Sequence, residues 1–350
     1  MDTVQFGIDT FGDVTRQPDG TPTSQAQVIR DVVEEAVLAD QVGIDAFGVG
    51  EHHRADFAIS APDMVLAAVA ARTERIALGS AVTVLSSDDP VRVFQRFSTL
   101  DALSNGRAEI TLGRGSFTES FPLFGYDLSS YETLFTEKLD LFAQLLTEEP
   151  VTWSGTVRAG LTDQEVFPHT EGRRLRAWVG VGGSPESVVR SARYGLPMML
   201  AIIGGEPARF APYVELYRRA VEQLELAPLP VGVHSPGHVG ETDEQAREEF
   251  FADYRVMRDR IGRERGWPVM SRHEFDREVE HGSLYVGSPE TVATKIAATV
   301  RLLGVQRFDL KYSAGPLPHA TMLRGIERYG TQVVPRVREL LAEAPEPLAV

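Results

Sequence analysis

Residues 179–195, VGVGGSPESVVRSARYG, run from an apolar stretch through a Gly-Ser-Pro-Glu turn into an amphipathic segment. Ser184 is suited to the N-cap, where its side chain accepts a hydrogen bond from a free backbone N–H. Pro185 fits the first helical position, where a missing N–H is harmless. Gly195 stands where the helix should end. The stretch therefore predicts a strand followed directly by a helix.

The same strand–helix unit recurs eight times along the chain. The expected strands are 4–9, 45–50, 76–85, 107–112, 177–182, 198–202, 231–234 and 307–312. The expected helices are 25–42, 61–73, 91–103, 131–147, 185–194, 207–226, 289–303 and 319–341, with Ser24, Ser60 and Ser288 as further N-caps. Repeated units of this kind indicate a parallel sheet with right-handed crossovers. Eight of them favour a (β/α)8 barrel, and we expect one domain over residues 1–350.

Two segments are longer than a barrel needs, 150–176 and 235–288. We expect both on the strand-to-helix side of the barrel. That face carries the active site in barrel enzymes, and long loops there usually shape a pocket. Both insertions are therefore expected to line the substrate pocket.

Composition and charge exclude several classes of function. The chain has no cysteine, which rules out disulfides, a thiolate nucleophile and a cysteine-based zinc site. With 50 Asp and Glu against 35 Lys and Arg, the net charge is -15, which argues against nucleic-acid binding. No apolar stretch is long enough to span a membrane, and the first residues do not resemble a signal peptide. We expect a cytoplasmic protein.

An acid and two histidines, Glu51-His52-His53, end the second predicted strand. Adjacent side chains on a strand point opposite ways, so the two histidines are poorly placed to bind one metal ion. We expect no metal site. Glu51 and one histidine could form a hydrogen-bonded cluster that ties down a loop. That interpretation and a functional one stay open for His53, and the position of His52 favours a reaction-site role.

Two helix starts share the Gly-Ser-Pro-Glu pattern, within 179–195 and within 285–304. Glycines let a ligand approach the backbone, and free N–H groups at a helix start favour an anion. Each start could hold a phosphate, or could be only a well-capped helix. The first is preferred as a ligand site because of Gly183, Ser184 and Ser187.

The stretch EITLGRGSF, residues 109–117, places Arg114 between Gly113 and Gly115 at the end of the fourth predicted strand. An arginine there could reach into the barrel mouth, or could pair with surface acids. Together with a glycine–serine helix start, it suggests a cofactor that carries a phosphate. The segment GVGGSP lacks the third glycine of the dinucleotide-binding fingerprint.

Longer stretches resemble a known family. They are GEHH (50–53), ALGSAVTVLSSDDPVRVFQRFSTLDALSNGRAEITLGRG (77–115), FGYD (124–127) and GSPESVVRSARYGLPMML (183–200). Together they resemble the flavin-dependent luciferase-like monooxygenases, especially the alpha subunit of bacterial luciferase. The resemblance implies a (β/α)8 barrel that binds FMN, often as reduced flavin from a separate reductase. Oxygen and a small organic substrate are the implied co-reactants.

The resemblance also implies roles for individual residues. It places His52 at the active site, a non-proline cis peptide at Ala81–Val82, and Arg114 near the flavin phosphate. It places the phosphate loop at Gly183, Ser184 and Ser187, and the flavin ring near Ala81, Val82 and Gly113. Three positions depart from luciferase: Gly113 replaces a reactive cysteine, about Glu132 a second arginine, and Ile202 a tryptophan.

From these residues we expect an FMN-dependent monooxygenase that works as a homodimer. His52 would hydrogen-bond or exchange protons near the reacting flavin atom. One alternative is a deazaflavin-dependent enzyme that transfers hydride without oxygen. Another is a non-catalytic flavin-binding partner subunit.

Overall fold

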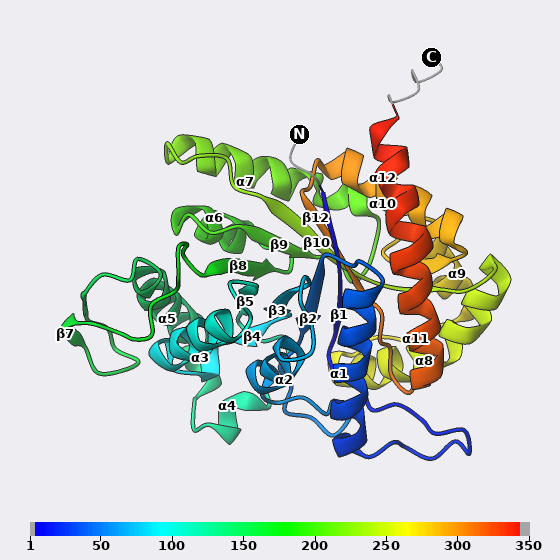
Figure 1. Ribbon diagram of the computed structural model, residues 1–350, viewed down its shortest axis with the longest axis horizontal. Coiled ribbons are helices and arrows are strands. Elements are labelled where there is room, and N and C mark those ends of the chain that lie inside the picture. Colours follow the sequence, from blue (N-terminus) through cyan, green and yellow to red (C-terminus); the bar gives the residue numbers. More distant parts are fainter. Residues whose placement is uncertain (1–3, 344–350) are drawn as a thin grey trace.

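Eight parallel strands form a closed barrel in the computed structural model, which describes residues 4–343 (Figure 1). The sheet closes because β10 pairs with both β9 and β12, and β12 pairs with β1. The expected (β/α)8 barrel is confirmed. The barrel strands are β1 (Gln5–Thr10), β2 (Ala46–Val49), β3 (Ala77–Ser80), β5 (Ala108–Gly113), β8 (Arg176–Val181), β9 (Met198–Ala201), β10 (Val231–Val239) and β12 (Arg307–Lys311).

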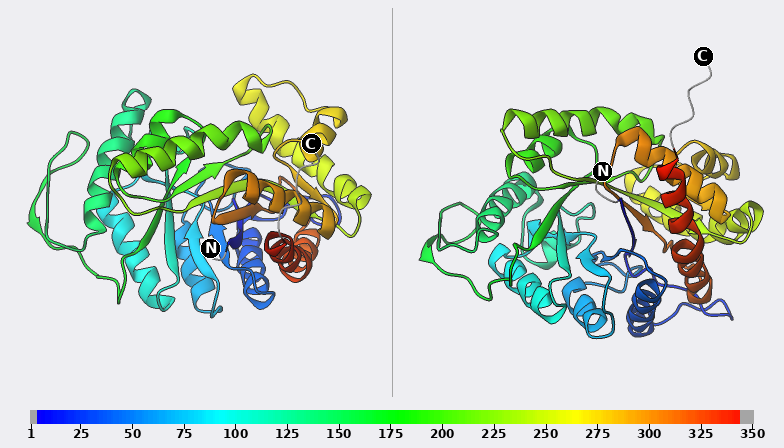
Figure 2. Two further views of the ribbon diagram at one scale, coloured as in Figure 1. Left: turned by 90° about the horizontal axis from the view of Figure 1, so that it is seen from above. Right: turned by 45° about the horizontal axis from the view of Figure 1, so that its top comes forward.

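Helices surround the barrel, as two further views show (Figure 2). They are α1 (Gln25–Gln41), α2 (Pro62–Ala70), α3 (Pro90–Leu103), α5 (Tyr131–Leu145), α6 (Pro185–Arg193), α7 (Ala211–Gln223), α10 (Pro289–Leu303), α11 (His319–Arg328) and α12 (Val334–Ala342). A π-helical turn, Tyr329–Val333, joins the last two. Shorter helices are α4 (Ser120–Leu123) and the 3-10 turns Leu85–Ser87, Leu128–Ser130 and Pro207–Phe210. No helix in the described range is long and apolar enough to span a bilayer.

Three of the four predicted serine caps are confirmed. Ser24, Ser184 and Ser288 each accept a hydrogen bond from the backbone N–H three residues later. The prediction for Ser60 is wrong: the residue before α2 is Ala61, which makes no side-chain cap. The helix begins one residue later than expected because Pro62 occupies its first position, where a proline fits best.

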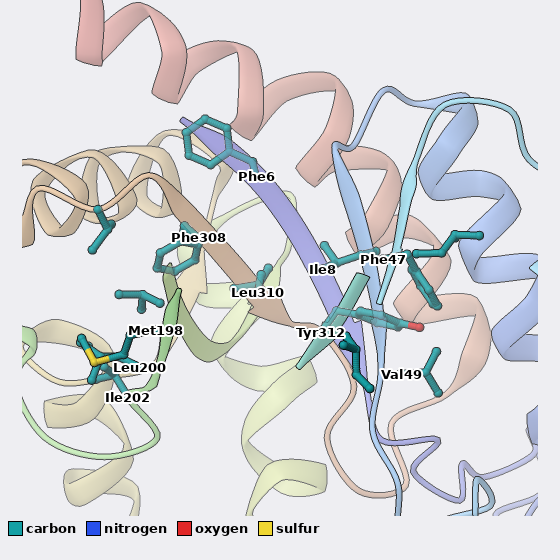
Figure 3. Packing of buried hydrophobic residues seen from close by; sticks show 14 of the residues in the cluster. Phe6, Ile8, Phe47, Val49, Met198, Leu200, Ile202, Phe308, Leu310 and Tyr312 are labelled. Carbon is teal, nitrogen blue, oxygen red and sulfur yellow. The ribbon is translucent and has the colours of Figure 1, made fainter. Parts of the chain in front are cut away.

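Alternation along the strands separates two environments. Phe6, Ile8 and Phe47 are fully buried, and Figure 3 shows them packed with other large apolar side chains. Burying a side chain of this size stabilises the fold by about 1.5–3 kcal/mol. The residues that alternate with them along the strands are small or charged. A Cβ added at Gly7 would lie 2.2 Å from Asp309 Oδ1, so a charged carboxylate occupies the barrel interior beside it.

The insertion at 235–288 begins within β10, which extends to Val239, and it contains α8 (Asp243–Arg265), α9 (Arg272–Glu280) and β11 (Tyr285–Gly287). β11 pairs with the outer end of β10. Side chains of α8, among them Tyr254 and Met257, line the main cavity of the protein. The insertion therefore lines this cavity, and its contact with a substrate stays a prediction.

The expectation for 150–176 is wrong. This segment follows α5 and precedes β8, so it is a helix-to-strand connection and starts from the opposite face of the barrel. It forms the hairpin β6 (Val151–Trp153) and β7 (Leu161–Gln164). Trp153 Nε1 donates to Asp140 of α5 at 2.9 Å. The hairpin therefore packs on the outside of that helix (Figure 1), and none of it lines the main cavity.

Candidate active site

A cavity of about 380 Å³ lies at the C-terminal ends of the barrel strands. Its lining includes residues from the loops after β2, β3 and β5 and from α8. Residues that line it include Asp9, Phe11, His52, Phe57, Ala81, Val82, Gly113, Arg114, Phe117, Gly182, His234, Tyr254, Met257 and Lys311. The predicted residues His52, Ala81, Val82, Gly113 and Arg114 therefore share one cavity.

His52 lies in an aromatic pocket within this cavity. Its ring centroid is 4.4 Å from that of Phe57, 4.6 Å from Phe11 and 5.3 Å from Phe117. The Nε2 atom is buried and has no hydrogen-bond partner among residues 4–343. Burial lowers the pKa of His52 to about 3, so the imidazole is neutral at pH 7. A neutral imidazole ring can donate or accept one hydrogen bond, but it carries no positive charge.

The neighbouring histidine has a different environment. His53 Nε2 lies 2.9 Å from Glu51 Oε1, and Glu51 Oε2 accepts a hydrogen bond from Val84 N at 2.9 Å. The Glu51 N–H also donates to the Val82 carbonyl at 3.1 Å. Glu51 and His53 thus form the hydrogen-bonded cluster that was one of the two interpretations. Through its bonds to Val82 and Val84, it fixes the chain that follows the Ala81–Val82 bond.

The Ala81–Val82 peptide is cis, as predicted. It separates β3 from the two-residue strand β4 (Thr83–Val84), so the predicted strand at 76–85 is interrupted there. Its neighbours are glycines. A Cβ at Gly113 would lie 2.3 Å from Val82 Cγ2, and one at Gly48 would lie 3.1 Å from Ala81 Cβ. The chain is therefore closely packed at this wall of the cavity.

Arg114 reaches the cavity and is paired with Glu132. The other oxygen of the Glu132 carboxylate accepts a hydrogen bond from Arg190 Nη2 at 2.9 Å. Burial alone would raise the pKa of Glu132, but the two arginines lower it. The Nη1 atom of Arg190 is buried, and no residue in the described part of the chain is its hydrogen-bond partner. The Glu132 carboxylate thus pairs with both arginines, and Arg190 retains one N–H donor with no partner among the described residues.

Arg190 was missed by the sequence analysis. Its signal was the spacing to Ser187, because residues three apart in a helix share a face. Luciferase has its second arginine where this chain has Glu132, so the substitution also pointed to a replacement elsewhere. Arg190, on α6, brings a second guanidinium to the Glu132 carboxylate that Arg114 also contacts.

The predicted phosphate loop lies beside the cavity. Gly183 has a positive φ of 101°, and Ser184 accepts the Ser187 N–H at 3.3 Å and donates to the Ser187 hydroxyl at 2.9 Å. Both serines are therefore used in capping α6. Gly182 lines the cavity, whereas Gly183, Ser184 and Ser187 do not. Their role toward a ligand stays a prediction.

Polar residues on the cavity floor were also missed. Asp9 Oδ2 lies 2.7 Å from His234 Nδ1. Lys311 Nζ donates to Asp13 at 3.1 Å. Their partners are more than 200 residues apart in the chain, so no local spacing could indicate them. Within residues 4–343, no three His, Asp or Glu side chains come together as a metal site.

Residues 7–307 match the sequence model of a family described as luciferase-like monooxygenase. Among solved structures, the monooxygenase RslO1 from Streptomyces bottropensis has a TM-score of 0.82 at 24% identity, covering 95% of this chain and 99% of its own. The oxygenating constituent of 3,6-diketocamphane monooxygenase from Pseudomonas putida, in complex with FMN, has a TM-score of 0.77 at 18% identity, covering 96% and 99%.

A third structure, an F420-dependent secondary alcohol dehydrogenase in complex with an F420-acetone adduct, has a TM-score of 0.76 at 15% identity. It covers 96% of this chain and 99% of its own. At these identities, the three structures show a shared fold. The sequence match over most of the chain places it in the family.

Proposed function

Because the chain belongs to the luciferase-like monooxygenase family, we propose that it is an FMN-dependent monooxygenase that uses reduced flavin and O2 to oxidise a small organic substrate. The observation that carries the proposal is the gathering of His52, Ala81–Val82, Gly113 and Arg114 around one cavity. The oxidoreductase class follows from the family. A separate flavin reductase, a homodimer and a cytoplasmic location stay predictions.

The residues present fit a flavin phosphate. A Cβ added at Gly182 would meet no atom within 4 Å, so the backbone there borders open space. Arg114 reaches the same cavity, and Arg190 carries a buried Nη1 without a partner. A phosphate could accept charge-assisted hydrogen bonds from both guanidinium groups. Glu132 would then have to lose its ion pair with at least one of the two arginines.

The residues also fit a flat ring in the cavity centre. Gly113 has no side chain, so the Val82 side chain beside it forms the cavity wall at this point. Reduced flavin, when bound here, would supply the electrons that activate O2. The rings of Phe11, Phe57 and Phe117 exclude water from the Nε2 atom of His52. His52 would offer one hydrogen bond there from a neutral imidazole.

The runner-up is a deazaflavin-dependent hydride transfer, which a structural neighbour performs with F420. The two are separated by mixing the purified protein with FMN, riboflavin or a deazaflavin and following fluorescence quenching. We expect tightest binding of FMN, and oxygen consumption with reduced FMN above the rate of free reduced flavin. Tighter binding of the deazaflavin without oxygen consumption would overturn the proposal. A flavin-binding chain that never turns over would indicate the partner-subunit alternative.

A further inference from the structure

A second histidine, His234 on β10, points into the same cavity and is paired with Asp9 on β1. Their Nδ1 and Oδ2 atoms are 2.7 Å apart, and Asp9 is only 1% exposed. Strand β12 lies between β1 and β10, so the two side chains meet inside the barrel. This contact fixes the orientation of the imidazole, because one of its nitrogens is already engaged.

The other nitrogen of His234 remains available. Within the described chain, Nε2 has no hydrogen-bond partner, yet it is not among the polar atoms sealed from solvent. The His234 side chain keeps 11% exposure, and the residue lines the cavity. Its ring lies parallel to that of Phe11, with centroids 6.0 Å apart. A fixed imidazole therefore presents one free nitrogen to whatever enters the cavity.

The groups around His234 favour its protonated form. Burial alone would lower the pKa of His234 and so would Lys311, but Asp9 raises it, with a smaller contribution from Asp309. Lys311 is itself held by Asp13 at 3.1 Å. With Nδ1–H donating to Asp9, a protonated ring has Nε2–H as a second donor.

The cavity thus holds two histidines in opposite electrostatic environments, and both contact the Phe11 ring. His52 lies 4.6 Å from the Phe11 ring and is kept neutral, whereas His234 stacks on it and is paired with a carboxylate. Environments that push the pKa values of two titratable groups apart are typical of sites where the groups have separate tasks.

A purely structural role for the pair is the competing explanation, since the contact also ties β1 to β10. That role requires only Nδ1. It leaves unexplained why Nε2 faces the cavity, and why Asp9 Oδ1 is buried with no hydrogen-bond partner in the part of the chain that the structure describes. An unpaired buried polar atom costs stability, and such atoms persist mainly where function requires them.

We propose that His234 is a catalytic residue that donates a hydrogen bond from Nε2 to a phenolate, enolate or carbonyl oxygen of the organic substrate, with Asp9 as its positioning residue. The proposal rests on the proposed function, because it places the substrate beside the flavin. It narrows the substrate to compounds with such an oxygen next to the carbon that is oxidised. The hydrogen bond stabilises negative charge on that oxygen and moves no atom.

The probe is 4-nitrophenol, whose absorbance distinguishes phenol from phenolate without any flavin. We expect the wild-type protein to bind it and to shift its ionisation toward phenolate. The variants His234→Asn and His234→Gln separate the two nitrogens. An asparagine amide can take the place of Nδ1 and keep the bond to Asp9, and a glutamine amide can take the place of Nε2. His273→Gln, at an exposed position on α9, is the matched control.

A binding role predicts that His234→Asn weakens phenolate binding at least tenfold while His234→Gln retains part of it. Asp9→Asn should lower the pKa of His234, followed through the imidazole proton resonances, and His273→Gln should change neither readout. A structural role predicts the reverse order, with Asn tolerated and Gln harmful, and that result would overturn the proposal. So would absence of a phenolate shift in the wild type. Failure of FMN to bind would instead count against the proposed function.

Discussion

His52 and His53 are adjacent in the chain, yet their Nε2 atoms have opposite surroundings. The Nε2 of His52 is buried among aromatic rings and has no hydrogen-bond partner within the described residues, whereas that of His53 lies 2.9 Å from the Glu51 carboxylate. Both residues lie in the loop after β2, which ends at Val49, and this loop directs the two side chains into different surroundings. His52 is therefore available for the reaction, whereas His53 holds the loop in place.

Substituting each histidine should separate these roles. We expect His52→Ala to keep the fold and FMN binding but to slow turnover by about a hundredfold, a typical effect of removing such a group. Because the pKa of His52 is lowered to about 3, it should add no inflection to the rate between pH 5 and 8. Steady-state rates across that range are the measurement, and an inflection that disappears in His52→Ala would contradict this account.

His53→Ala should act on stability. Its removal leaves one oxygen of the buried Glu51 carboxylate without its partner, which typically costs about 1–3 kcal/mol. Urea unfolding of His53→Ala and His52→Ala under the same conditions provides the comparison. Greater loss of turnover in His53→Ala than in His52→Ala would show that the functional histidine was assigned wrongly.

The phosphate site can be tested through its two arginines. Arg114→Ala and Arg190→Ala should each weaken FMN binding more than Ser187→Ala does, because a charge-assisted hydrogen bond is stronger than a neutral one. Riboflavin affinity should change little in all three. Flavin fluorescence quenching gives both constants. If FMN and riboflavin bind the wild type equally, there is no phosphate site here.

Glu132→Gln should have the opposite effect. In the wild type the Glu132 carboxylate contacts both arginines and competes with a phosphate for them. Neutralising it should tighten FMN binding by about tenfold, which corresponds to 1.4 kcal/mol. Glu137→Gln, on the same helix but bonded to the hairpin residue Thr156, is the control. Weaker FMN binding in Glu132→Gln would mean that this carboxylate positions the arginines and does not compete with the ligand.

Two glycines test the placement of the ring and the phosphate. Gly113→Ala should destabilise the protein by about 1–3 kcal/mol even without flavin, because its Cβ would lie 2.3 Å from Val82 Cγ2. Gly182→Ala meets no atom within 4 Å, so it should leave unfolding unchanged and weaken only FMN binding. Thermal unfolding with and without FMN separates the two effects. Unchanged FMN affinity in Gly182→Ala would place the phosphate elsewhere.

Much of the fold was predictable because its signals are local. The apolar runs, the serine caps and the glycines after helices act over a few residues, and all eight barrel strands lie within the predicted ranges or extend beyond them by a few residues. The hairpin at 150–176 was misplaced because its length suggested a pocket loop, although its position after a helix already assigned it to the other face.

The site was predictable only in part, for a related reason. His52, Ala81–Val82 and Arg114 stand in recognisable stretches. Asp9 and His234 are unremarkable in their own strands, and only closure of the barrel brings them together. Contacts between residues so distant in the chain leave no spacing to read in one sequence.

The two cavity histidines should make stability depend on pH with opposite signs. The pKa of His52 is lowered on folding, so the unfolded chain binds a proton that the folded one does not. The stability that His52 contributes is present above the ordinary histidine pKa of about 6.5 and is lost as the pH falls toward 3. The pKa of His234 is raised on folding, so the stability that His234 contributes is full below about pH 6.5 and is lost as the pH rises through the raised pKa.

Urea unfolding between pH 5 and 9 measures the contributions of both histidines to stability. Relative to the wild type, His52→Phe should gain stability as the pH falls below about 6.5, and Asp9→Asn should lose most at the acid end of the range. Parallel stability curves for the wild type and both variants would contradict the protonation states assigned to these histidines.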